Sequence, residues 1–173
     1  PADSRPILEG ANKSFGFVPN LLATMAEAPS VAKGYTTLSS LFDQTSFSDT
    51  EQQVVLLTVS RFHECHYCMA AHSVIAAMKS APEDVVEALR NDNTIPDEKL
   101  EALRLFTRSM VKSRGNPTPS VLKDFQEAGY GERQVLEVIL GIAMKTLSNF
   151  TNHIAEVPLD EAFKGKKWTP PSN

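Results

Sequence analysis

Both cysteines of this 173-residue chain, and two of its four histidines, lie in one short stretch of sequence. The stretch covers residues 64–72 and reads ECHYCMAAH. On a helix, Cys65, Cys68 and His72 would fall within an arc of roughly 60° on one face. Two thiols one turn apart can close a disulfide, and an imidazole one turn beyond them can accept or donate a proton. The pattern therefore indicates redox chemistry.

The position of the two cysteines within a helix decides how reactive they are. A helix that starts near residue 65 would lower the pKa of both thiols, because its N-terminus favours negative charge. Glu64 next to Cys65 would raise the pKa of that thiol, or would simply face solvent. His66 and Tyr67 would point away from the face that carries the cysteines.

Two other interpretations of the stretch stay open at this point. Cys65 and Cys68 would be inert if they were only buried neighbours in a core. They would bind zinc if His72 and either His63 or His66 completed a set of four ligands. Structural zinc sites usually join two separated segments, whereas all of these residues lie within ten positions of one another.

Composition excludes several classes of protein. Hydrophobic residues make up 42% and charged residues 22% of the chain, as in ordinary globular proteins. A net charge of -4 without a basic run disfavours nucleic-acid binding. No apolar run reaches membrane-spanning length, and no charged leader precedes one, so we expect no membrane association and a cytoplasmic location. A disulfide between two cysteines this close in sequence cannot join distant segments and so stabilise a secreted fold. This favours a catalytic role for the pair.

The elements around the stretch are predicted to be helical throughout, in one domain that covers residues 1–173. Ser48 and Glu51 form a capping-box pattern, which predicts a helix start. The helix that follows, to Phe62, is apolar on nearly every side and is predicted to be the buried central helix. The tail after Pro158 is predicted to be an exposed extension. The other predicted helices cover residues 6–13, 19–26, 31–44, 65–80, 82–90, 96–114, 120–127 and 132–155.

The motif resembles that of the carboxymuconolactone decarboxylase superfamily, and most closely its alkylhydroperoxidase D-like, peroxidase-related branch. The specific part is Cys65-x-x-Cys68-x-x-x-His72 after a capped, buried helix. Further similarity lies at FVPNL, residues 17–21, followed by Ala28-Pro29, and at NHIAEVP, residues 152–158. Decarboxylases of the superfamily lack the cysteine pair, which favours the peroxidase branch.

The resemblance implies an all-α helical bundle whose subunits assemble into homo-trimers or homo-hexamers. It also implies a thiol peroxidase that needs no cofactor or metal and reduces hydrogen peroxide or small organic hydroperoxides. Cys68 would attack the peroxide, and Cys65 would resolve the sulfenic acid as a disulfide. His72 would belong to a proton relay. A dithiol, or a reducing partner protein, would restore the pair.

Two residues depart from the pattern that the resemblance implies. Gln53 stands where the family's relay has a glutamate, and an amide can position a water or a histidine but cannot carry a proton. Tyr67 replaces the relay histidine between the cysteines. Glu64 or His66 would then be substitute acid–base groups.

Two further functional hypotheses follow from these departures. The protein would be a non-enzymatic redox switch or oligomeric binding module, or else a lyase acting on a ring lactone as elsewhere in the superfamily.

Overall fold

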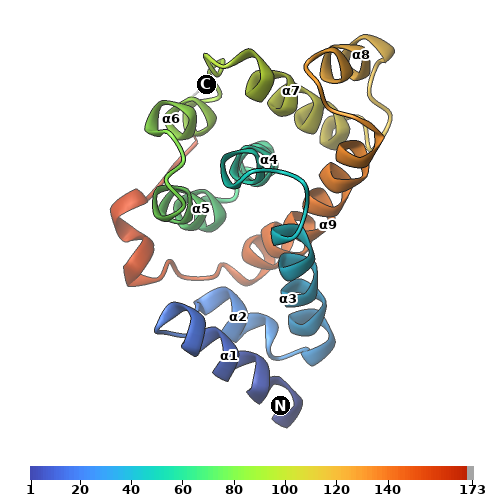
Figure 1. The fold of residues 1–173 in the computed structure, drawn as a ribbon. Helices are drawn as coiled ribbons and strands as arrows, with labels where there is room; N and C mark the ends of the chain where they lie inside the picture. The colour runs from blue at the N-terminus through green and yellow to red at the C-terminus, as the bar shows by residue number, and fades with distance from the viewer. Residues whose placement is uncertain (171–173) are drawn as a thin grey trace.

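The structure is a computed structural model that describes residues 1–170 (Figure 1). Within those residues it contains helices and no strand, which confirms the all-α class. Pro171 of the predicted tail lies outside the described residues. The elements are η1 (Ala2–Ser4), α1 (Arg5–Phe15), α2 (Asn20–Met25), α3 (Pro29–Asp43), α4 (Asp49–Phe62), α5 (His66–Met78), α6 (Glu83–Asn91), α7 (Glu98–Lys112), α8 (Pro119–Glu127), α9 (Glu132–Ala155) and η2 (Glu161–Lys166).

Helix α4 lies at the centre of the fold, as its apolar sequence predicts. It packs against α5, α6, α7 and α9, which surround it in Figure 1. Its side chains Val54, Val55, Leu57 and Val59 are fully buried. Because this helix is apolar on nearly every side, its stability comes from burial all round rather than from one amphipathic face.

The predicted cap of α4 is present in the structure. The Glu51 N–H donates to Ser48 Oγ at 3.3 Å, and the Ser48 N–H donates to the Glu51 carboxylate at 2.8 Å. The same carboxylate accepts a hydrogen bond from the Tyr130 hydroxyl at 2.9 Å. These contacts account for Glu51 as a structural residue that fixes where α4 begins.

Helix α9 crosses the molecule and contacts α3, α4 and α5. A Cβ atom at Gly141 would come within 2.8 Å of Phe42 in α3 and of Val55 in α4. Glycine at this position therefore allows the three helices to approach closely. The close approach brings the second half of α9 alongside the start of α5.

The C-terminal segment packs on the fold, so the prediction of an exposed tail is wrong. Element η2 lies against α5, as the red segment of Figure 1 shows, and Phe163 and Trp168 are buried. Trp168 Nε1 donates to the Arg90 carbonyl at 2.9 Å, and the Arg90 guanidinium donates to the carbonyls of Lys166 and Lys167 at 3.1 Å. The burial of two aromatic rings and these hydrogen bonds stabilise the packed segment, although its charged residues and prolines are typical of an exposed one.

Among residues 1–170, no helix combines the length and the apolar character that a membrane span needs.

Candidate functional site

A tight turn between α4 and α5 positions the two cysteines. Glu64 adopts a left-handed backbone conformation with φ of 54°, and the chain then enters α5 through Cys65, which is its N-cap. The Cys65 N–H donates to the Ser60 carbonyl at 2.9 Å, which fixes this turn to the end of α4. Cys68 lies in the first turn of α5. Both thiols are buried and free.

Three polar residues of α9 face Cys68 from the other side. Asn152 Nδ2 is 3.3 Å from Cys68 Sγ, and Ser148 Oγ is 3.8 Å from it. Lys145 lies one turn before Ser148, within roughly 60° of Ser148 and Asn152 on the helix surface. The Asn152 amide donates to the sulfur, whereas the Ser148 hydroxyl accepts from the Cys68 thiol and donates to the Lys145 carbonyl at 3.2 Å.

The environment separates the two thiols in acidity. Burial alone would raise the pKa of the Cys68 thiol, but a hydrogen bond from Cys65, the charge of Lys145 and the Ser148 hydroxyl outweigh it, so that this pKa is lowered well below its ordinary value. The hydrogen bond to Cys68, together with burial, raises the pKa of the Cys65 thiol. Of the two thiols, Cys68 is the one whose surroundings favour the thiolate, and Cys65 is a neutral thiol beside it.

Lys145 is a functional candidate that sequence reasoning missed. Its side chain is fully buried, and its Nζ atom has no hydrogen-bond partner among residues 1–170. The signal in the sequence is a single cation in the middle of the apolar part of α9. Which residue it would face could not be read from that position, because Cys68 lies more than seventy residues earlier in the chain.

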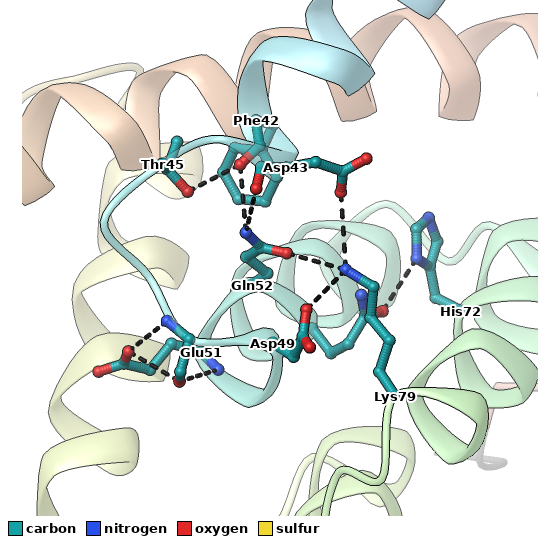
Figure 2. Close-up of polar contacts among 10 residues, drawn as sticks. Phe42, Asp43, Thr45, Asp49, Glu51, Gln52, His72 and Lys79 are labelled. Carbon is teal, nitrogen blue, oxygen red and sulfur yellow. Dashed lines mark hydrogen bonds and ion pairs between the residues drawn. The ribbon is translucent and has the colours of Figure 1, made fainter.

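His72 and Gln53 form a buried pair. His72 Nδ1 is 3.1 Å from Gln53 Oε1, and Figure 2 shows this hydrogen bond beside the ion pair of Lys79. Burial, and then the charges of Lys145 and Lys79, hold the pKa of His72 well below its usual value. The imidazole is therefore neutral at pH 7. Since Gln53 Oε1 accepts the Nδ1 proton, Nε2 carries a lone pair and can accept a proton but not donate one.

Tyr67 is held by the C-terminal segment rather than directed to proton transfer. Its hydroxyl donates to the Asp160 carboxylate and accepts a hydrogen bond from the Leu21 N–H at 3.4 Å. The same carboxylate accepts the Asn20 N–H at 3.1 Å and 3.2 Å, at the start of α2. Burial and then the hydrogen bond to Asp160 raise the pKa of Tyr67, which keeps the phenol protonated. Tyr67 thus connects α5, α2 and the C-terminal segment.

The remaining predicted residues lie away from Cys68. Glu64 is exposed. His66 Nδ1 is 3.2 Å from the Trp168 carbonyl, and the two rings pack edge to face. His63 Nδ1 is 3.0 Å from Asn149 Oδ1. Across the described part of the chain, no three His, Cys, Asp or Glu residues are grouped as metal ligands.

A cavity of about 840 Å³ opens beside Cys68. Cys68, His72, Gln53 and Lys145 all contribute to its wall, so these four residues border one common space. Its volume is in the range of small-molecule binding sites. The rest of the wall is mostly apolar and aromatic, with contributions that include Phe15, Phe17, Tyr35, Leu56, Val74 and Phe163.

Comparisons with known proteins reveal the fold but no close relative. No family model matches the sequence, and no curated protein resembles it significantly. A solved structure of a peroxidase-related protein from Ralstonia eutropha JMP134, described as an alkylhydroperoxidase AhpD core, superposes with a TM-score of 0.83. It is 18% identical and is matched over 94% of this chain and 88% of its own.

Two further solved structures are similar. A peroxidase-related protein from Silicibacter sp. TM1040 has a TM-score of 0.83 at 16% identity, over 96% of this chain and 89% of its own. The debrominase Bmp8, in a complex with 2,3,4-tribromopyrrole, has a TM-score of 0.77 at 19% identity, over 93% of this chain and 87% of its own. The chain therefore has the all-α, alkylhydroperoxidase D-like fold.

Proposed function

We propose that this chain, which has the alkylhydroperoxidase D-like fold, is a cofactor-independent thiol peroxidase. The observation that carries the proposal is the Cys68 thiol, which lies at the wall of a cavity with its pKa lowered and with a second free thiol, Cys65, beside it. A thiolate is the form that attacks peroxides, and a neighbouring thiol is what a sulfenic acid needs to form a disulfide. Hydrogen peroxide or a small organic hydroperoxide is the proposed substrate.

The reaction takes place in three steps. The Cys68 thiolate attacks one oxygen of the peroxide, the O–O bond breaks, and the products are Cys68 sulfenic acid and an alkoxide or hydroxide that takes up a proton. The Cys65 thiol then displaces the hydroxyl group from Cys68, which yields the disulfide and water. Finally, an external dithiol reduces the disulfide and is itself oxidised.

The residues around Cys68 have distinct roles in this scheme. Asn152 donates a hydrogen bond to the sulfur at 3.3 Å and holds it in place. His72, neutral and fixed by Gln53, offers its Nε2 lone pair as a proton acceptor. A dithiol reductant, a homo-trimeric or homo-hexameric assembly and a cytoplasmic location belong to the same proposal.

Single cysteine variants test the proposal. Cys68→Ser should abolish peroxide consumption, because the attacking sulfur is gone. Cys65→Ser should react once and stop at the sulfenic acid, which a cyclic dione traps and mass spectrometry detects on Cys68. Peroxide consumption at the parental rate in both variants would contradict the mechanism. Slow single oxidation of the parent, with no recycling by any dithiol, would instead favour a redox switch.

Reductive dehalogenation is a second candidate function, favoured by the apolar and aromatic wall of the 840 Å³ cavity. Hydrogen peroxide needs far less room, and the debrominase of the same fold was solved with a brominated pyrrole bound. Cys65 and Cys68 together hold the two electrons that convert a C–Br bond into C–H and bromide, with closure of their disulfide. Bromide released from 2,3,4-tribromopyrrole, with none from Cys68→Ser, would support this function; no release would exclude it for that substrate.

A further inference from the structure

Three polar groups in the surroundings of Cys68 have no role in the scheme above: the amine of Lys145, the Oδ1 atom of Asn152 and the phenol of Tyr35. Of these, Lys145 and Asn152 Oδ1 are buried and have no hydrogen-bond partner among residues 1–170. A buried, unpaired ammonium is strongly unfavourable unless a counter-charge lies close by. The position of Lys145 therefore requires an explanation.

The geometry of α9 supplies that explanation. Lys145, Ser148 and Asn152 occupy positions i, i+3 and i+7, and the last two contact Cys68. Lys145 contributes to the wall of the same cavity as Cys68, and its charge lowers the pKa of the Cys68 thiol. The Cys68 thiolate is therefore the anion that is best placed to balance the buried ammonium.

No other cation among the described residues is placed to balance the charge of a Cys68 thiolate. Around Cys68 stand Cys65, Tyr35 and Tyr67, whose pKa values are all raised, and His72, whose pKa is lowered, so that each of them is uncharged at neutral pH. Lys79, the other lysine of this region, forms ion pairs with Asp49 and Asp43, which Figure 2 shows. Its amine lies 2.8 Å from the Asp49 carboxylate and 3.6 Å from that of Asp43. Its charge is already balanced.

The scheme also lacks an acid. The leaving alkoxide must take up a proton, whereas His72 Nε2 carries none and Gln53 cannot supply one. Two lysines contribute to the cavity wall, and of these Lys79 is already paired with Asp43 and Asp49. This leaves Lys145, because an ammonium group has protons to donate.

We infer that Lys145 is a catalytic residue of this site: its ammonium group forms an ion pair with the Cys68 thiolate and then gives its proton to the leaving oxygen. The inference rests on the proposed peroxidase function. In the relay that the family resemblance implies, a glutamate carries the proton, and Gln53 cannot do so. Lys145 would instead give its proton directly to the leaving oxygen.

The protons balance through the cycle. Attack by the thiolate breaks the O–O bond, and the alkoxide leaves as the alcohol with the proton of Lys145, so that Cys68 sulfenic acid and a neutral amine remain. The amine then accepts the proton of Cys65 as this thiol attacks, and returns it to the departing hydroxide as water. Reduction of the disulfide by a dithiol supplies two protons, of which one restores the Cys65 thiol and the other the ammonium.

The test separates the charge of Lys145 from its proton. In a Cys65→Ser background, Cys68 is the only thiol, and its ultraviolet absorbance against pH reports the thiolate directly. The rate of oxidation by hydrogen peroxide and by tert-butyl hydroperoxide is measured in the same samples. This rate depends both on the fraction of Cys68 present as thiolate and on protonation of the leaving oxygen. The variants are Lys145→Met, which removes both functions, and Lys145→Arg, which keeps the charge on a group that does not give up its proton. Lys79→Met is the matched control.

Lys145→Met should raise the titration midpoint of Cys68 by roughly one to three pH units, the effect of removing an adjacent opposite charge. Oxidation near neutral pH should slow by about tenfold or more. Lys145→Arg should titrate like the parent yet react slowly with both peroxides. Lys79→Met should leave the titration of Cys68 unchanged.

If Cys68 of the Lys145→Met variant has the same titration midpoint as in the parent, the ion pair is refuted. If the Lys145→Arg variant is oxidised by both peroxides at the rate of the parent, the acid role is refuted. If Lys145→Met does not fold, as judged by circular dichroism, the parent still decides, since an ordinary titration of its Cys68 contradicts the inference. The proposed function can fail separately from the ion pair. If the titration of Cys68 depends on Lys145 as described but no peroxide oxidises the thiolate, the peroxidase function and the acid role are refuted. The ion pair is then still supported.

Discussion

At the scale of single residues, the two thiols of the site have unequal surroundings. Cys68 faces polar side chains of α9, of which Asn152 donates to its sulfur, whereas Cys65 is enclosed at the end of α4. The two thiols are three residues apart, yet their pKa values shift in opposite directions. In the proposed peroxidase, this inequality would give the dithiol a defined order of reaction, in which Cys68 attacks and Cys65 resolves.

Gln53 allows a direct test of what the missing carboxylate would do. Gln53→Glu should raise the pKa of His72, because a carboxylate at 3.1 Å from Nδ1 favours the imidazolium. An imidazolium can donate a proton, so we expect faster peroxide reduction at neutral pH. Nuclear magnetic resonance titration of His72, together with turnover, checks both parts. Unchanged turnover despite a raised pKa would show that His72 does not serve as an acid here.

At the scale of elements, the site depends on how closely α9 approaches α3 and α4. Gly141→Ala should lower the free energy of unfolding by about 1–3 kcal/mol, since its Cβ would come within 2.8 Å of Phe42 and Val55. Chemical denaturation measures the change. The matched control is Gly34→Ala within α3, where a Cβ meets open space, and there we expect a gain of up to about 1 kcal/mol from helix propensity. Equal effects at both positions would contradict the close approach.

Most element boundaries could be predicted because local residues set them. The capping box at Ser48, for example, acts within one turn of the chain. Lys145 could not be assigned a role from the sequence, because its importance comes from a contact with Cys68 across the fold. The packed tail was missed for the same reason: only Phe163 and Trp168 signal it, among charged residues and prolines.

At the scale of the molecule, the C-terminal segment connects distant parts of the chain at the site. Trp168→Ala should destabilise the fold by about 3 kcal/mol, because a buried indole and its hydrogen bond to the Arg90 carbonyl are lost. Trp168→Phe keeps most of the burial and should cost only about 1 kcal/mol. Thermal and chemical unfolding of both variants checks the order, and equal stability of the alanine variant and the parent would mean that the segment does not hold α5.

The predicted homo-oligomer has a surface on which it can be tested. Exposed apolar residues of α9 lie within roughly 60° of one another on the helix, and they are Leu136, Ile139, Phe150 and Ile154. Ile154 is 89% exposed in the single chain. We expect Leu136→Glu combined with Ile154→Glu to convert trimers or hexamers into monomers in light scattering. Assembly that survives both charges would place the contact elsewhere.

The most direct test of the central claim is the intact mass of the parent protein after one equivalent of peroxide, with a parallel count of free thiols. The mechanism predicts rapid loss of both thiols and a mass decrease of two hydrogens, which is the signature of the Cys65–Cys68 disulfide. Reduction by a dithiol should restore the original mass. Thiols that stay intact, or that react no faster than free cysteine, would contradict the account.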